Sequence, residues 1–151
     1  MNVSRLIKQL EIDEGIRLRV YEDSLGYLTV GIGHYINKND PEDIKDLKIG
    51  DRITKERAYS LLMNDLAVAI QDAVIIFYSK WETFPHAAQE VFINMIFNMG
   101  RTRFMKFRKT IAAAYAHDWN EVSKEMLDSR WATQVGNRAG RLSSKIRALA
   151  K

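Results

Sequence analysis

The chain has 151 residues, of which 46% are hydrophobic and 28% charged, an ordinary balance for a globular protein of one or two small lobes. It contains no cysteine, which excludes disulfides, thiolate catalysis and zinc-finger chemistry. Its net charge of +4 is uneven, because residues 101–151 hold 12 Lys and Arg against 4 Asp and Glu. This basic third suggests a polyanionic partner, either nucleic acid or an anionic bacterial envelope, although solvated surface charge explains many such residues individually.

No apolar run of the sequence reaches the ~20 residues that span a bilayer. The N-terminus has the pattern of an amphipathic helix with charges at Arg5, Lys8 and Glu11, which is not the pattern of a secretory signal. We therefore expect the protein to accumulate in the cytoplasm in which it is made.

The first predicted element is a helix that ends at Glu14. Apolar residues from Val3 to Leu10 are spaced as an amphipathic stripe, and Glu14 stands four residues further along it. Gly15 follows as a cap. Partial burial and the negative end of the helix dipole both favour a neutral carboxyl group here, as a general acid requires. The alternative is that Glu14 pairs with an arginine and shapes the helix end.

Two strand-like runs joined by a turn follow the helix. Asp23 to Gly26 fits a type I turn. A solvated, ionised Asp23 and a partly buried Glu14 form the pattern of an acid and base pair. Strand alternation places Thr29 on a face that Gly31 and Gly33 leave bare, where a ligand or water could approach. The residues leave an ordinary hairpin with an Asx turn equally open.

A long helix is predicted in the middle of the chain. Residues 35–52 are polar, without a sustained period, and indicate loops with at most one short helix. Thr54 then supplies an N-cap, and apolar residues recur every fourth position from Leu62 to Tyr78 without a breaker. This helix, from Lys55 to about Ser79, is long enough to connect two lobes.

The last part of the chain is predicted to be helical. The segment from Ala87 to Met99 is apolar on nearly every side, which is typical of a buried central helix, and Gly100 ends it. Asp118 and Asn137 are predicted helix caps. The fold class is therefore α+β, mainly α, with a small sheet near the N-terminus.

The sequence predicts neither a metal site nor a cofactor. Its histidines, His34, His86 and His117, lack the spacing of metal ligands, and His34 shares a strand face with apolar residues, which favours a structural role. The glycines at 31–33 are too few for a dinucleotide fingerprint. No serine stands in a nucleophile elbow.

Three stretches of the sequence resemble the T-even phage-type lysozymes, a family of endolysins. They are EGIRLRVYEDSLGYLTVGIGH at 14–34, INMIFNMG at 93–100 and SRWATQVGNRAGR at 129–141. Three separated matches in the right order are far more specific than one short motif. The resemblance implies a single lysozyme-like domain made of an N-terminal catalytic lobe (1–53), a connecting helix (54–79) and a helical C-terminal lobe (80–151).

The resemblance also implies a function in the lysis of a bacterial host. The family hydrolyses the β-1,4 bond between N-acetylmuramic acid and N-acetylglucosamine in peptidoglycan. By this pattern Glu14 protonates the leaving oxygen, Asp23 acts on the opposite side of the sugar as base or electrostatic partner, and Thr29 holds the attacking water. Inversion of configuration, the usual assignment, needs carboxyl groups ~6.5–9.5 Å apart. Release to the wall would need a separate membrane-permeabilising protein.

Further residues take roles by matching position. The implied substrate-binding residues are Tyr35, Phe97, Asn98, Thr110, Glu125 and Arg130. Four of them depart from the family's residues, and the change to Glu125 adds a charge. The resemblance also implies support of the site by an ion pair of His34 with Asp65, by Arg138 against Glu14 and by Arg141 against Asp13.

Two other functions are weighed beside this one. A basic helical nucleic-acid-binding protein would explain the charge of residues 101–151 but gives no role to Glu14, Asp23 and Thr29, and its binding would collapse with salt. An inactive lysozyme homologue that only binds the wall is disfavoured, because those three residues are intact. We expect a monomer whose partner is the glycan strand of peptidoglycan, without nucleic acid.

Overall fold

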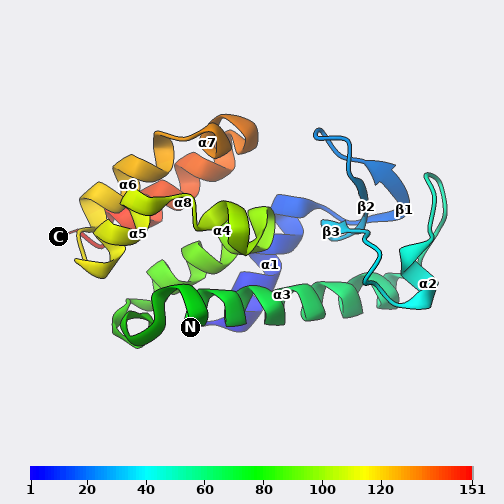
Figure 1. Cartoon of the computed structure of the whole chain (residues 1–151), viewed down its shortest axis with the longest axis horizontal. Coiled ribbons are helices and arrows are strands. Elements are labelled where there is room, and N and C mark those ends of the chain that lie inside the picture. Colours follow the sequence, from blue (N-terminus) through cyan, green and yellow to red (C-terminus); the bar gives the residue numbers. More distant parts are fainter. Residues whose placement is uncertain (151) are drawn as a thin grey trace. The chain divides into compact units, whose positions relative to one another are not determined.

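A computed structural model describes residues 1–150 as a mainly helical protein with one small antiparallel sheet (Figure 1). The elements are α1 (Val3–Glu14), β1 (Arg17–Glu22), β2 (Leu28–Gly31), β3 (His34–Tyr35), α2 (Glu42–Lys45), α3 (Lys55–Phe77), the 3₁₀ helix η1 (Tyr78–Thr83), α4 (His86–Phe104), α5 (Arg108–Tyr115), α6 (Trp119–Leu127), α7 (Arg130–Val135) and α8 (Asn137–Arg147). The predicted fold class is confirmed.

The chain divides into two compact units. The N-terminal unit is Ser4–Ala67, and the C-terminal unit combines Met1–Val3 with Val68–Lys151. Helix α3 contributes residues to both units. The division at residues 53 and 79 that the sequence predicts stays a prediction.

Helix α1 ends where the sequence predicts. Leu6 and Leu10, two residues of the apolar stripe, are buried. Gly15 adopts a φ of +72° and donates its N–H to the carbonyl of Glu11, which closes the last turn. The stripe therefore delivers Glu14 as the last residue of the helix.

The sheet has the strand order β1-β2-β3. The predicted turn is present, since Gly26 donates its N–H to the carbonyl of Asp23 at 3.0 Å. Strand β2 ends at Gly31, however, and His34 opens β3 instead of continuing β2. The predicted alternation through His34 is wrong, because Gly31 and Gly33 both adopt a φ of +71° and turn the chain between the strands.

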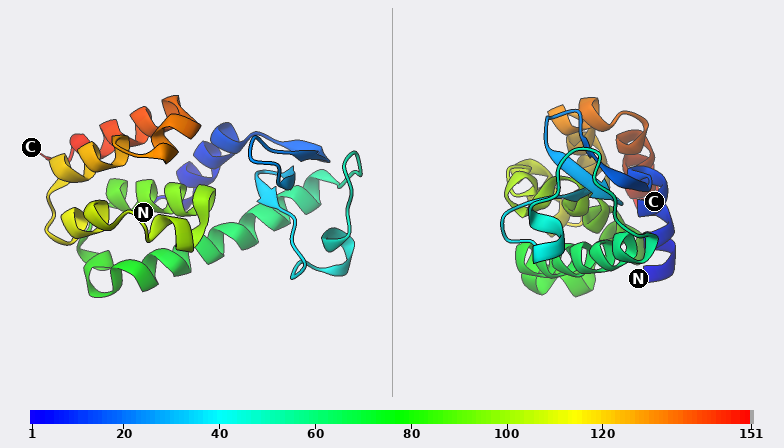
Figure 2. Two further views of the ribbon diagram at one scale, coloured as in Figure 1. Left: turned by 45° about the horizontal axis from the view of Figure 1, so that its top comes forward. Right: turned by 90° about the vertical axis from the view of Figure 1, so that its right-hand side faces the viewer.

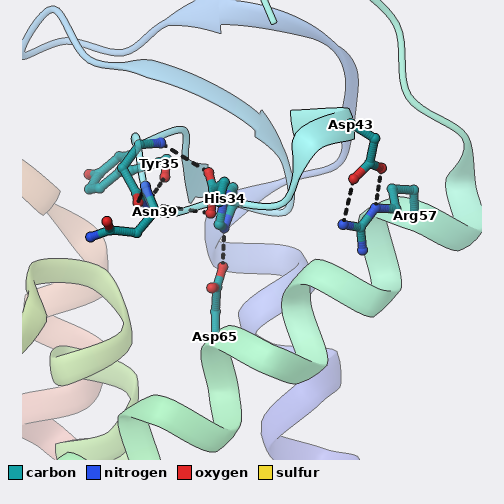
Figure 3. Close-up of polar contacts among 8 residues, drawn as sticks. His34, Tyr35, Asn39, Asp43, Arg57 and Asp65 are labelled. Atoms are coloured by element: carbon teal, nitrogen blue, oxygen red, sulfur yellow. Dashed lines mark hydrogen bonds and ion pairs between the residues drawn. The ribbon is translucent and has the colours of Figure 1, made fainter. Parts of the chain in front are cut away.

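A small apolar core holds the N-terminal unit together. Its buried residues are Val20, Val30, Ile44 and Leu61. The short helix α2 is tied to α3 by Arg57, whose Nε and Nη2 contact the two carboxylate oxygens of Asp43 at 2.7 and 3.2 Å (Figure 3). This core and this ion pair fix the loop region against the sheet and α3.

Helix α3 begins as predicted, with the Thr54 hydroxyl accepting the N–H of Arg57 at 3.1 Å. Its buried side differs from the predicted stripe, because Val74 and Tyr78 are 42% and 79% exposed. A spacing of four residues drifts by about 40° per step around a helix of 3.6 residues per turn. The buried residues follow the true period: Leu62, Leu66, Ala69, Ala73 and Phe77.

The stretch Lys55–Thr83 is long and apolar enough to cross a membrane by length and composition alone. Core helices of globular proteins pass the same test, so the finding is weak evidence of a span. Two acids of the stretch contact basic side chains: Asp65 contacts His34, and Asp72 contacts Arg101.

Helix α4 is the buried helix that the sequence predicts. Its residues from Val91 to Ile96 are all buried, and Gly100 breaks it with a φ of +81° and a ψ of 163°. The ring of Phe77 lies 4.7 Å from that of Phe92 and 5.0 Å from that of Phe84, between ring centroids. An aromatic cluster therefore anchors α4 in the C-terminal unit.

Two further helices pack side by side in this unit, α6 and α8 (Figures 1 and 2). The Asp118 side chain caps α6 by accepting the N–H of Glu121, as predicted. The predicted cap at Asn137 is wrong, because Gly136 holds the N-cap position with a φ of +58° and Asn137 is the first helical residue. Glycine takes this position since a side chain there would be strained.

Candidate functional site

The Glu14 carboxylate lies against the backbone of Gly33. A Cβ built on Gly33 would stand 2.6 Å from Oε1 of Glu14 and 2.9 Å from its Cδ, closer than real Cβ atoms approach. The half-buried side chain of Glu14 leaves the end of α1 and passes over the turn between β2 and β3. Glycine at position 33 therefore creates the space that this carboxylate occupies.

Asp23 is held by the turn that follows β1. Its Oδ1 accepts the N–H groups of Leu25 and Tyr27 at 2.9 and 2.8 Å, and its own N–H donates to the Tyr27 carbonyl at 2.9 Å. This Asx turn fixes the direction of the half-buried carboxylate. Both of these backbone N–H groups donate to Oδ1, and Oδ2 accepts neither of them.

Tyr21 connects the predicted catalytic residues. Its Cα pairs with that of Thr29 across β1 and β2, and opposite residues of an antiparallel pair project from the same face. Burial raises the pKa of the Tyr21 phenol, and the negative charges of Glu14 and Asp23 raise it further. The charges of both carboxylates thus raise the pKa of one phenol, and it belongs to the residue that pairs with Thr29 across the strands.

Arg17 opposes those two carboxylates at the same phenol. Its Cζ lies 3.7 Å from the centroid of the Tyr21 ring, a cation–π contact, and its charge lowers the pKa that burial and the acids raise. Neither residue was singled out from the sequence. The predicted turn could have found Tyr21, because the turn fixes the register that sets Tyr21 opposite Thr29.

Thr29 does not stand on a bare face. It is 1% exposed, and its hydroxyl donates to the Tyr27 carbonyl at 3.0 Å. The room beside the glycines is filled by protein atoms, since a Cβ on Gly31 would lie 3.3 Å from Cβ of Ala58. The expected open face is therefore wrong, and these glycines permit packing of the chain upon itself.

His34 bridges two carboxylates within the N-terminal unit. Its Nδ1 lies 2.8 Å from Oδ2 of Asp65, the contact that the resemblance implies, and its Nε2 lies 2.9 Å from Oδ2 of Asp40 (Figure 3). Burial lowers the pKa of His34, but the hydrogen bonds and charges of the two acids outweigh burial and raise it above 6.5. The second acid, Asp40, was not anticipated from the sequence.

The predicted substrate residues are distributed over both units. Tyr35, in the N-terminal unit, is 39% exposed, and its ring centroid lies 5.7 Å from that of Tyr27. In the C-terminal unit, Phe97 and Asn98 are half-buried in α4, and Arg130 is exposed at the start of α7. Nothing yet tests their contact with a substrate.

Thr110 and Glu125 line one pocket of about 350 Å³ in the C-terminal unit. Thr110 is 2% exposed, whereas Glu125 is half-buried. The other lining residues are Lys106, Phe107, Arg108, Lys109, Asp128 and Ser129. With three cations and two acids in its lining, the pocket is suited to a strongly polar group.

Arg138 is buried in the C-terminal unit, at 8% exposure. Its Nε donates to Oδ1 of Asn94 at 2.9 Å, and its Nη2 lies 3.5 Å from the carbonyl oxygen of Asn94. The implied pairs of Arg138 with Glu14 and of Arg141 with Asp13 stay predictions. Within residues 1–150, no group of three or more His, Asp or Glu is arranged to hold a metal ion.

The phage lysozyme family model matches residues 11–148, which is most of the chain and includes Glu14, Asp23 and Thr29. The chain belongs to the phage lysozyme family. It is a lysozyme-type glycoside hydrolase, and the expected enzyme class is confirmed. Family membership also supports the coarser function, peptidoglycan hydrolysis.

Among three individual relatives, one is named a lysozyme, one an endolysin and one a spike protein. The chain is 30% identical over 160 residues to the probable T4-type lysozyme 1 of Dictyostelium discoideum, covering 95% of this chain and 94% of that protein. It is 34% identical over 158 residues to the pre-baseplate central spike protein Gp5 of Enterobacteria phage T4, covering 93% of this chain but 27% of Gp5. It is 33% identical over 100 residues to the endolysin of Salmonella phage P22, covering 65% and 62%.

Proposed function

We propose that this family member is an endolysin that hydrolyses the β-1,4 bond between N-acetylmuramic acid and N-acetylglucosamine in bacterial peptidoglycan. The observation that supports this most is the arrangement around Tyr21. Its phenol experiences the charges of both Glu14 and Asp23, and its Cα pairs with that of Thr29. Glycoside hydrolysis requires a pair of carboxyl groups that flank the scissile bond, and Glu14 and Asp23 would supply that pair.

In the proposed mechanism Glu14 is the general acid. It is half-buried and is the last residue of α1. The contact with Gly33 limits the directions that its carboxyl group can adopt. Glu14 would donate its proton to the leaving glycosidic oxygen as the bond breaks.

Asp23 would act on the opposite side of the sugar, as the base or as an electrostatic partner. The two backbone N–H groups that donate to its Oδ1 hold the carboxylate in place, so no cationic side chain is needed to orient it. Thr29 would hold the attacking water, because its hydroxyl donates its own proton to the Tyr27 carbonyl and keeps its lone pairs as acceptors. Since Thr29 is 1% exposed, this role requires the packing around it to open when the glycan binds. A single displacement by that water inverts the anomeric configuration.

The proposal extends to the biological setting. The enzyme would be made in the cytoplasm of the bacterial host as a monomer, cross the membrane through a separate permeabilising protein and then degrade the wall. The excess of cations in residues 101–151 would favour its association with an anionic envelope.

The test is hydrolysis of purified peptidoglycan by the wild type, Glu14→Gln and Glu22→Gln. Glu22 is the matched control, because it is an exposed glutamate of β1 that loses the same charge. We expect Glu22→Gln to retain activity and a folded Glu14→Gln to lose at least about 100-fold, the usual contribution of a general acid. Equal activity of both variants would remove Glu14 from its role.

The products of the same reaction test the remaining steps. New reducing ends at N-acetylmuramic acid identify the bond, and the anomer that forms first, observed by proton NMR, reports the stereochemistry. Retention would contradict direct attack by a water. Absence of glycan cleavage, together with salt-sensitive binding of duplex DNA, would favour the nucleic-acid-binding alternative.

A further inference from the structure

A groove of about 500 Å³ lies along β1 in the N-terminal unit, and its lining includes Tyr21 but none of the predicted catalytic residues. Its lining includes three arginines, Arg17, Arg19 and Arg52, all of them exposed, and the exposed side chain of Ile49. Within residues 1–150 none of the three guanidinium groups has a carboxylate partner within ion-pair distance. The groove is therefore strongly cationic, although residues 1–100 together are acidic.

Two of these arginines stand directly opposite each other. Arg19 pairs with Arg52 in an isolated antiparallel β-bridge. The flanking residues exchange the hydrogen bonds, from Val20 N–H to the Asp51 carbonyl at 2.9 Å and from Ile53 N–H to the carbonyl preceding Arg19 at 2.8 Å. Arg19 and Arg52 thus occupy a non-hydrogen-bonded pair, in which opposite Cα atoms are only about 4.5 Å apart.

This placement is unfavourable for the isolated protein. Like charges that are directly opposite on neighbouring strands destabilise a sheet. The backbone bonds on both sides of the pair prevent the two residues from sliding apart. The Arg19 guanidinium group has one hydrogen bond among the described residues, a long contact of 3.4 Å from Nη1 to the Gly50 carbonyl. This acceptor is neutral and does not offset the repulsion between the two charges. An anion between the two guanidinium groups would remove the repulsion.

The geometry of the pair selects among anions. A guanidinium group binds carboxylate or phosphate through two parallel hydrogen bonds. One carboxylate has two oxygens and one charge, which suits one arginine. A phosphate group carries three acceptor oxygens and up to two charges, so it can serve both arginines together.

We propose that Arg19 and Arg52 form a binding site for a phosphate group. Arg17, at the other end of the groove, extends the cationic surface but is committed to the Tyr21 ring. The phosphate could be a free ion or the phosphomonoester headgroup of phosphatidic acid, which keeps three free oxygens and up to two charges. The proposal does not depend on glycan hydrolysis, because it concerns other residues and a different ligand.

The experiment compares thermal unfolding of the full chain in phosphate, acetate and chloride at equal ionic strength. We expect phosphate to raise the melting temperature by about 2–4 °C beyond the other two salts. Arg19→Gln and Arg52→Gln should remove this specific rise without lowering the melting temperature in chloride. Lys38→Gln is the matched control, since it removes an exposed cation of the same unit outside the groove and should keep the rise.

Two results would overturn the proposal. The first is a melting temperature that is no higher in phosphate than in acetate. The second is a phosphate response that persists in both arginine variants. Sedimentation with vesicles that contain phosphatidic acid, against phosphatidylcholine vesicles, separates the sources. Binding that Arg19→Gln abolishes assigns the phosphate to a lipid headgroup, and a phosphate response without vesicle binding assigns it to a free ion.

Discussion

The Glu14 carboxylate occupies the space that a side chain at Gly33 would fill, with only 2.6 Å between Oε1 and the position of a Cβ. Gly33→Ala would therefore displace the proposed general acid. Its φ of +71° adds a backbone cost of about 1–2 kcal/mol for a residue with a Cβ. We expect kcat/KM on peptidoglycan to fall about 100-fold, the effect of moving a catalytic group by roughly 1 Å.

Gly50→Ala separates the clash from the backbone strain. Gly50 also has a positive φ, of +91°, but nothing lies within 4 Å of a Cβ at this position. In urea, Gly50→Ala should lose only the unfolding free energy of the backbone strain and Gly33→Ala should lose more, because it adds the clash. Only Gly33→Ala should lose activity. Unchanged activity of Gly33→Ala would show that the Glu14 carboxyl group is not held by this contact.

The difference between these glycines shows how far the sequence predicts the site. Gly15 and Gly26 were predicted from local rules, because a helix cap and a turn involve only neighbouring residues. The contact of Gly33 with Glu14 joins residues that are nineteen positions apart in the printed sequence, and no local pattern contains it. The predicted bare face beside Thr29 failed for the same reason.

The helices also show the difference between features that a local sequence pattern predicts and features that depend on the fold. The burial of residues 91–96 was predicted, because a segment that is apolar on all sides has one interpretation. Val74 of α3 is exposed although it continues the apolar spacing of four residues, because that spacing matches one helical face only over a short length. The partners of His34 depend on the fold: the family resemblance implies Asp65, but nothing in the sequence indicates Asp40.

The bridge from His34 to Asp65 and Asp40 predicts that stability depends on pH. The pKa of His34 is raised in the folded protein above its ordinary value of 6.5. The stabilisation is therefore fully present below about pH 6.5 and is lost as the pH rises through the folded pKa. We expect a lower free energy of unfolding at pH 9 than at pH 6, measured by urea denaturation, and a smaller difference in His34→Gln.

His86→Gln is the control for this pH dependence. His86 is exposed at the first position of α4, in the other compact unit, and its substitution should leave the difference between pH 9 and pH 6 unchanged. At pH 6, Asp65→Asn should cost about 1.5–3 kcal/mol, the contribution of a hydrogen bond to a charged group. Identical pH profiles of the wild type and His34→Gln would contradict the prediction.

Asn94 supports a buried cation in the C-terminal unit. Asn94→Ala removes the side-chain oxygen that accepts the Nε–H of Arg138 at 2.9 Å. Because both residues are buried, we expect a loss of about 1–3 kcal/mol in unfolding free energy. Asn94→Asp keeps an acceptor at that position and should lose less. Thermal unfolding compares the two variants, and equal stability of both would contradict the prediction.

Trp131 fixes the orientation of one predicted substrate residue. Its Nε1–H donates to Oδ1 of Asn98 at 2.9 Å, so the amide of Asn98 presents its NH₂ group in a defined direction. Trp131→Phe keeps an aromatic ring in this buried position, 3% exposed, but removes the donor. If Asn98 binds the glycan and takes no part in bond cleavage, KM should rise several-fold while kcat stays nearly constant. Steady-state kinetics on soluble glycan fragments measure both, and Asn98→Ala should show the same change. A fall in kcat at constant KM would instead place the Trp131–Asn98 pair in the chemical step.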